Sequence, residues 1–184
     1  MRLVFGRDGG RRAAAGFALL GAAWALAGCV ETAADIAPGP DQAQFVRRPD
    51  ASMAGATVAI MSIEGAPDAQ TAAFQQSLDQ AAAQRQIAVA PPTSARYLAR
   101  GYLSAGLIKD GATVDVVWDV FTPDKQRAQR LSDSIAVRGS GDDPWAMVDG
   151  NALATVAAKS ADDLAAYLSN TPEAAPGGAL SYAQ

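Results

Sequence analysis

The most reactive side chain in this 184-residue sequence is the thiol of Cys29, its only cysteine. Cys29 follows an uncharged run, residues 13–28, and this run follows a stretch with four arginines and one aspartate. Such a layout is typical of a secretory signal peptide. As a helix, the 16 residues of the run span about 24 Å, less than the roughly 30 Å hydrocarbon core of a bilayer. The run therefore suits transient membrane engagement followed by cleavage.

Leu26-Ala27-Gly28-Cys29 resembles the lipobox of bacterial lipoproteins, in which a branched apolar residue and two small residues precede a cysteine. The resemblance implies cleavage between Gly28 and Cys29, and a sulfur that carries a diacylglyceryl group. At about 0.8 kcal/mol per buried CH₂, two or three acyl chains would hold the mature protein on the bilayer. Because Val30 rather than aspartate follows the cysteine, the family's sorting rule implies the outer membrane, facing the periplasm. The alternatives are an ordinary signal peptide with an incidental cysteine, or an uncleaved anchor.

Two carboxylates, Asp115 and Asp119, lie on one face of an expected strand, with Arg127 and Arg130 on its expected neighbour. Such a group could act as a paired-carboxylate centre for acid–base catalysis. Four residues along a strand span about 13 Å, however, which exceeds the usual separation of the two carboxylates in a glycosidase. Cross-strand ion pairs on a solvated face are therefore the better interpretation.

The sequence contains no histidine, which excludes Ser-His and Cys-His nucleophile systems and zinc sites built on imidazole. Asp142, Asp143 and Asp149 could suggest calcium, but their spacing does not follow an EF-hand loop, so helix capping explains them better. Without the signal segment, the 15 basic and 19 acidic residues become 11 and 18. The mature chain is thus acidic and a poor nucleic-acid binder. We expect no metal, no cofactor and no enzymatic activity.

Aromatic side chains are the candidates for a binding surface. Trp145, Tyr97 and Tyr102 could form a platform that holds a sugar ring or a partner's apolar anchor. Trp118 falls on the wholly apolar side of an alternating strand, so we expect it in the core. Gly101, inside another expected strand, indicates a bulge or the close approach of another backbone.

The elements that must position these residues form one expected domain, residues 56–169, of normal size for a single core. Apolar periodicity and turn residues predict four strands after the first helix and one before it. We expect strands at 57–63, 87–92, 96–108, 112–121 and 127–138, and helices at 68–86, capped by Asp68, and at 144–169, interrupted or recapped at 149–151. The order β-α-β-β-β-β-α predicts an α+β fold, a single small sheet with an antiparallel meander and two helices packed on it.

The segments on either side of the domain carry a different composition. Residues 29–55 comprise the acylated cysteine and a proline-containing stretch that we expect to be a flexible tether. Its 26 residues after Cys29 would span about 28 Å as a random coil. Residues 170–184, rich in glycine and proline, are expected to be a disordered tail.

The segment RGYLSAGLIKDGATVDVVWDVFTPDKQRAQRLSD, followed by DPWAMVD, resembles uncharacterised lipoproteins of Gram-negative bacteria with a strand–turn–strand core. In element order the chain is also similar to the periplasmic domains of the penicillin-binding-protein activator lipoprotein, the curli-secretion lipoprotein and the N-terminal domain of the Tol–Pal β-propeller protein. Those families contact other envelope proteins. The resemblance implies a non-enzymatic interaction or scaffolding module for a cell-wall or transport complex, with an unknown protein partner. The alternatives are a small-ligand or glycan binder and, last, a carboxylate hydrolase, for which no nucleophile with an adjacent base is visible.

Overall fold

The computed structural model describes residues 45–176. The predicted signal peptide, Cys29 and residues 30–44 lie outside the described residues, as do residues 177–184. The elements in chain order are β1 (Ala51–Ser52), the 3₁₀ turn η1 (Met53–Gly55), β2 (Val58–Glu64), α1 (Asp68–Gln84), β3 (Tyr97–Ile108), β4 (Gly111–Phe121), β5 (Arg127–Arg138), the 3₁₀ turn η2 (Trp145–Met147), α2 (Gly150–Ser169) and β6 (Ala175–Pro176).

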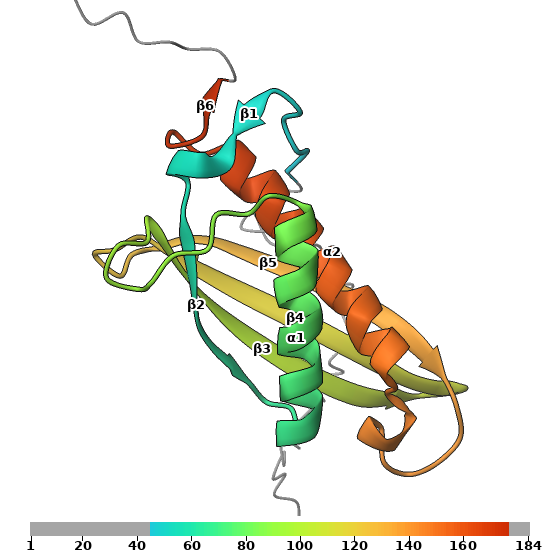
Figure 1. The fold of residues 1–184 in the computed structure, drawn as a ribbon. Helices are drawn as coiled ribbons and strands as arrows, with labels where there is room; N and C mark the ends of the chain where they lie inside the picture. Colours follow the sequence, from blue (N-terminus) through green and yellow to red (C-terminus); the bar gives the residue numbers. More distant parts are fainter. Residues whose placement is uncertain (1–44, 177–184) are drawn as a thin grey trace, which may run out of the picture. The chain divides into compact units, whose positions relative to one another are not determined.

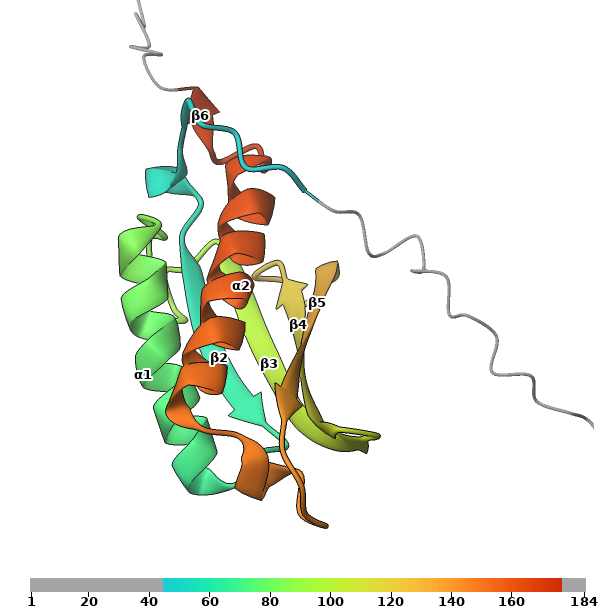
Figure 2. The same ribbon diagram turned by 90° about the vertical axis from the view of Figure 1, so that its right-hand side faces the viewer.

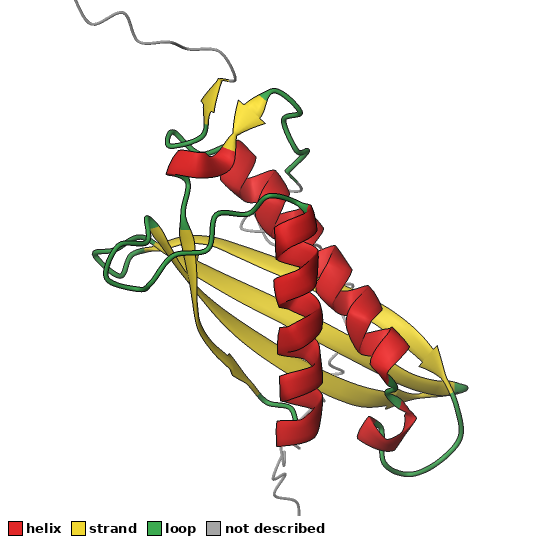
Figure 3. Ribbon diagram, in the orientation of Figure 1, coloured by secondary structure: helices red, strands yellow, loops and turns green. Residues whose placement is uncertain are grey.

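The main sheet has four strands in the order β2-β3-β4-β5, and β1 and β6 form a separate two-stranded pair (Figure 1). β2 runs parallel to β3, and the other two pairings are antiparallel. The parallel step requires a crossover, which α1 provides, whereas short turns join the antiparallel strands. Figure 3 shows the two long helices lying over the same sheet. The predicted α+β class, with an antiparallel meander and two packed helices, is confirmed.

One face of the sheet is covered and the other is not. Both helices lie on the same side, as Figure 2 shows, and no helix within residues 45–176 covers the opposite side. We call the first side the helix-covered face and the second the open face. Antiparallel sheets often have this arrangement, because side chains alternate between a packed side and a solvated side.

The helix-covered face carries the predicted core residues of β4. Val114, Val116, Trp118 and Val120 are all fully buried, which confirms that Trp118 belongs to the core. Gly101 of β3 lies directly opposite Trp118 in the register. A Cβ atom at Gly101 would lie 2.9 Å from two atoms of the indole ring. The close approach predicted at Gly101 is therefore real, but the approaching group is a side chain and not a backbone.

The predicted hairpin between the third and fourth strands is also present. Lys109 and Asp110 form a two-residue turn between Ile108 and Gly111, which are paired in the register. Gly111 has φ +150, and a Cβ atom there would lie 1.9 Å from the carbonyl oxygen of Val137. Glycine is required at this position for both reasons.

The strand predicted at residues 87–92 is wrong. Only Val89 pairs, through a single parallel bridge to Val58, and its side chain is exposed. Pro91 and Pro92 follow, and a proline has no N–H to donate to a ladder. The Pro91 carbonyl accepts hydrogen bonds from Ser94 and Ala95 in a turn instead. The chain thus has one strand fewer than predicted between its two helices.

The helix starts differ in detail from those predicted. α1 begins at Asp68, and Pro67 is its N-cap, so Asp68 lies in the first turn and does not cap the helix. The predicted interruption of the last helix is present. η2 holds Trp145, and Asp149 then caps α2 by accepting a hydrogen bond of 2.8 Å from the N–H of Ala152.

The folded part extends beyond residues 56–169 at both ends. Met53 and Ala56 are buried before the domain, and Thr171 and Ala174 are buried after it. β1 and β6 pair these two extensions with each other. Residues 45–55 therefore do not belong to a flexible tether, and residues 170–176 do not belong to a disordered tail. Composition suggested otherwise because proline and glycine content does not report burial.

Candidate functional site

The open face presents rows of side chains that run across the strands. β3 contributes Arg100, Tyr102 and Ser104, and their partners on β4 are Asp119, Val117 and Asp115. On β5 the same rows continue with Arg130, Ser132 and Ser134. The face therefore has a charged row, a mixed row with Tyr102, Val117 and Ser132, and a row of hydroxyl and carboxylate groups in succession.

Asp119 and Arg130 form a bidentate ion pair in the charged row. Arg130 Nε donates to Asp119 Oδ1 at 2.8 Å, and Nη2 donates to Oδ2 at 2.7 Å. The Asp119 side chain is 8% exposed and that of Arg130 is 42% exposed. The predicted cross-strand ion pairing is present here, whereas Asp115 accepts a hydrogen bond of 2.9 Å from Thr113 Oγ1. Both oxygens of Asp119 are occupied, so this geometry does not favour a role for it as a general base.

Arg100 lies beside this pair and is held differently. Its guanidinium carbon lies 5.9 Å from the centre of the Phe121 ring, a stacking distance for a cation–π contact. Arg100 is exposed, and no salt bridge joins it to a carboxylate of residues 45–176. At this distance the face of the ring attracts the guanidinium group, and the residue remains exposed to solvent.

The three aromatic residues predicted as a binding surface do not lie together. Tyr97 is buried on the helix-covered face, and its hydroxyl donates a 2.5 Å hydrogen bond to Glu173 Oε2. Burial, followed by this bond to a carboxylate, raises the pKa of Tyr97. Tyr102 is 38% exposed on the open face. Trp145, in η2, is half-buried and packs against the core. The predicted platform is therefore wrong, because positions 97 and 102 have opposite parity in one strand.

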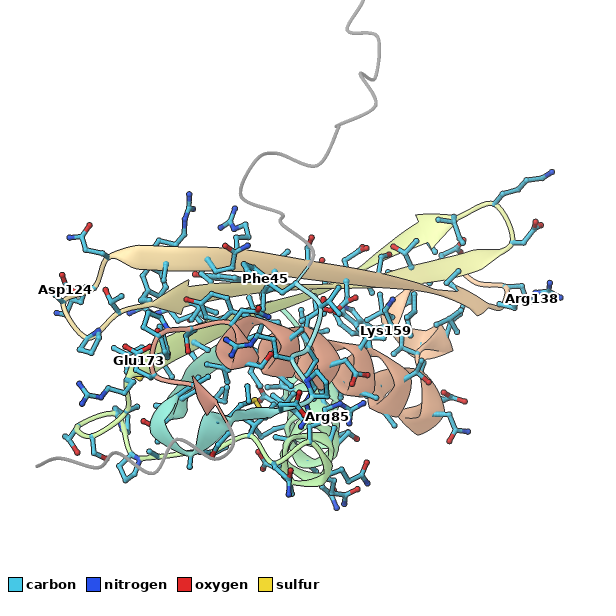
Figure 4. The ribbon with its side chains drawn as sticks, turned by 90° about the horizontal axis from the view of Figure 1, so that it is seen from above. Phe45, Arg85, Asp124, Arg138, Lys159 and Glu173 are labelled. Carbon is cyan, nitrogen blue, oxygen red and sulfur yellow. The ribbon has the colours of Figure 1, made fainter. Side chains whose placement is uncertain are left out.

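A short segment that precedes the fold is fixed to the end of α2. We call residues 45–48 the strap. Phe45 packs edge-on against Tyr167, which in turn packs against Tyr97. Asn170 Nδ2 donates to the carbonyl of Val46 at 2.9 Å, and the N–H of Arg48 donates to Ser169 Oγ at 3.0 Å. Figure 4 labels Phe45, which lies over α2 in that view. The sequence signal was an isolated aromatic residue within the expected tether.

The strap also reaches the C-terminal end of α1. Arg47 Nη2 donates to the carbonyl of Arg85 at 3.0 Å. Arg85 itself donates to both oxygens of Asp162 in α2, at 2.6 and 2.7 Å, and this contact lowers the pKa of Asp162. A cavity of about 320 Å³ opens beside the strap, lined mainly by backbone and small side chains together with Arg47, Met53 and Gln86. The strap thus joins both helices at one end.

A charged cluster lies between α2 and β5 on the helix-covered face. Lys159 Nζ is 3.3 Å from Asp133 Oδ1, and Asp133 is largely buried. Burial and the neighbouring negative charge of Asp133 raise the pKa of Asp163 to about 6. Lys159 opposes this shift and Asp162 adds to it. The Asp163 carboxyl group therefore takes up a proton in weakly acidic solution.

Two of the acidic residues considered for calcium, Asp143 and Asp149, instead accept hydrogen bonds from backbone N–H groups at helix starts, as the capping prediction expects. Asp143 Oδ1 accepts a hydrogen bond of 2.9 Å from the N–H of Trp145, and Asp149 caps α2. Within residues 45–176, no group of three or more Asp, Glu, His or Cys side chains is arranged to hold a metal ion.

No protein-family model and no curated protein matches this chain. The solved structures that match this chain include two of a dodecameric protein. Both are the PelC dodecamer of Paraburkholderia phytofirmans, one of them a single-substitution variant. The variant has 12% identity, a TM-score of 0.44, and coverage of 66% of this chain and 94% of PelC. The other has 12% identity, a TM-score of 0.43, and coverage of 67% and 94%. At these TM-scores we base no conclusion on the likeness.

None of the helices in residues 45–176 combines the length and the apolar character that a membrane crossing requires.

Proposed function

We propose that this protein is a lipid-anchored, non-enzymatic interaction or scaffolding module of a bacterial envelope complex. The acylated sulfur of Cys29 would hold it at the outer membrane, facing the periplasm, as the lipobox resemblance implies. The observation that carries the proposal is the separation between the strap and the β3–β4 hairpin. The strap packs near the start of β3, and the hairpin follows the end of β3.

β3 begins at Tyr97, which contacts Tyr167 beneath the strap, and ends at Ile108 in the hairpin. Its twelve residues span about 36 Å at 3.3 Å per residue. Leu107 and Ile108 are 54% and 44% exposed at the far end. An anchored chain that enters the fold at the strap therefore holds two exposed aliphatic side chains at a distance from its point of attachment. Exposed apolar groups of this kind favour contact with a protein partner.

The anchor is tested by replacing Cys29 with serine. We expect lipid labelling and membrane retention to be lost in Cys29→Ser, because the oxygen of serine does not accept the diacylglyceryl group. Membrane fractionation and mass spectrometry of the N-terminus measure the result. Unchanged fractionation, or a mature terminus elsewhere, would contradict the anchor.

The contact surface is tested by photo-crosslinking in cells. A crosslinking residue at position 107 should capture one defined protein, and the same residue at Gln76, exposed on α1, should not. The double variant Leu107→Ser with Ile108→Ser should then lose co-purification of that protein, with an unchanged melting temperature. Equal capture from both positions would count against the hairpin as the contact surface.

A further inference from the structure

We infer that the open face binds an acidic saccharide, with Arg100 receiving a sugar carboxylate and Tyr102 lying under a sugar ring. The inference goes beyond the proposed protein contact and does not depend on the anchor or on the hairpin. It rests on the order of side chains along β3, where Arg100, Tyr102 and Ser104 all point to the open face.

Arg100 is suited to a carboxylate because it is exposed and lies over an aromatic ring. The Phe121 ring supports one side of the guanidinium group. The neighbouring carboxylate, Asp119, is already bound through both oxygens to Arg130. The planar fork of an arginine matches a carboxylate through two parallel hydrogen bonds. Arg100 thus offers a cation whose fork is not occupied by a carboxylate of residues 45–176.

The next two rows suit the ring and the hydroxyl groups of a sugar. Successive residues on one face of a strand are about 6.6 Å apart, so Tyr102 lies roughly one sugar ring away from Arg100. Tyr102 has Val117 as its partner on β4 and Glu64 as its partner on β2, and Ser132 continues the row on β5. The following row contains Ser104, Asp115 and Ser134. Hydroxyl and carboxylate oxygens in this row can accept and donate hydrogen bonds to sugar hydroxyl groups.

The same face disfavours an anionic peptide that binds as an added strand. A peptide would bring backbone N–H and C=O groups, but those of β3 and β4 are already paired on both sides within the sheet. An exposed arginine, an exposed aromatic ring and a row with two serines fit a ligand with carboxylates and many hydroxyl groups.

The test is a titration of the full-length protein in detergent micelles with tetragalacturonate, followed by calorimetry. We expect saturable binding, and at least ten-fold weaker binding of the neutral match, galactotetraose. Arg100→Gln should weaken tetragalacturonate binding at least ten-fold, and Tyr102→Ala several-fold. The matched control is Arg138→Gln, since Arg138 is an exposed arginine at the other end of β5, as Figure 4 shows. It should change the affinity less than two-fold.

Four results would overturn the inference. The first is no saturable binding of tetragalacturonate, and the second is equal binding of galactotetraose. The third is an equal loss in Arg100→Gln and Arg138→Gln, which would indicate unspecific attraction of charge. Tetraglutamate binding as tightly as tetragalacturonate would overturn it in favour of an acidic protein segment. Circular dichroism of each variant distinguishes a lost site from a lost fold.

Discussion

On the helix-covered face of the sheet, Val116 and Trp118 are fully buried and the Trp118 ring lies against the bare backbone of Gly101. On the open face of the same strands, Asp119 and Arg130 are joined by two short hydrogen bonds. On the helix-covered face, side-chain volume decides which residues fit, because protein interiors are as dense as organic crystals. On the open face, the pairing of charges decides, because a buried carboxylate must be matched by a hydrogen-bond donor.

Because of this difference, the same type of substitution should change the free energy of unfolding by different amounts on the two faces. Adding or removing atoms should matter under the helices and matter little on the open face. Removing a charge should matter most where the carboxylate is buried. The following experiments test that contrast, and each compares a position on one face with a matched position elsewhere.

The largest effect is expected from Trp118→Ala. Removing a fully buried indole leaves a cavity and should destabilise the protein by about 3–5 kcal/mol. The matched variant, Val117→Ala on the open face, should cost less than about 1 kcal/mol, since Val117 is half-buried. Urea unfolding measures both free energies. Similar values for the two variants would remove the distinction between the faces.

Glycine substitutions in β3 make the contrast sharper. Gly101→Ala places a Cβ atom 2.9 Å from the Trp118 ring and should destabilise by about 1–3 kcal/mol. At Gly106, on the open face, a Cβ atom would meet only Thr113 Oγ1, at 3.8 Å. Gly106→Ala should therefore be neutral or stabilising by up to about 1 kcal/mol, because alanine restricts the unfolded chain. Thermal unfolding of the two variants gives the sign directly, and the same sign for both would refute the assignment of faces.

The ion pair is expected to contribute less than the packing of Trp118. Asp119→Asn removes one charge of a pair whose arginine remains partly in water, and we expect a loss of about 1–2 kcal/mol. A double-mutant cycle with Arg130→Gln isolates the interaction between the two side chains. A coupling energy close to zero would show that the open face does not depend on this pairing.

The smallest effect concerns the polar part of the helix-covered face. The pKa of Asp163 is raised to about 6, so the folded protein binds a proton more tightly than the unfolded chain. The resulting stabilisation is present in acid and is lost as the pH rises through about 6. Because Asp163 is half-exposed, solvent screening reduces the change to about 1 kcal/mol.

Asp163→Asn tests this origin of the pH dependence. The amide imitates the protonated acid, so the variant should be more stable than the wild type at pH 7.5 and similar to it at pH 4. Denaturant midpoints at a series of pH values between these limits measure the slope. A slope that persists in the variant would assign the titration to another group.

The sequence predicted the strands and helices better than the surroundings of individual side chains. Alternation placed Val114, Val116 and Trp118 on one face correctly, because period two is fixed by strand geometry. It failed for residues 87–92, where the apolar run resembles a strand but two prolines end the ladder after one bridge. Short apolar runs are ambiguous for this reason.

Contacts between segments that are far apart in the sequence were harder to predict. The pairing of Asp119 with Arg130 was predicted, because both lie on adjacent strands of a meander. The contact of Phe45 with Tyr167 joins residues more than a hundred positions apart, and no local pattern encodes it. Tyr97 and Tyr102 were grouped because both are aromatic, although their parity places them on opposite faces.

The position of Asp133 has a consequence for association between molecules. β5 is the outermost strand on its side of the sheet, and a strand from a neighbouring molecule could extend such a sheet indefinitely. Asp133 points inward from the middle of β5 toward Lys159, so an added strand would strip the remaining water from both charges. An inward-pointing charge on a terminal strand is one of the features by which proteins discourage the addition of a further strand.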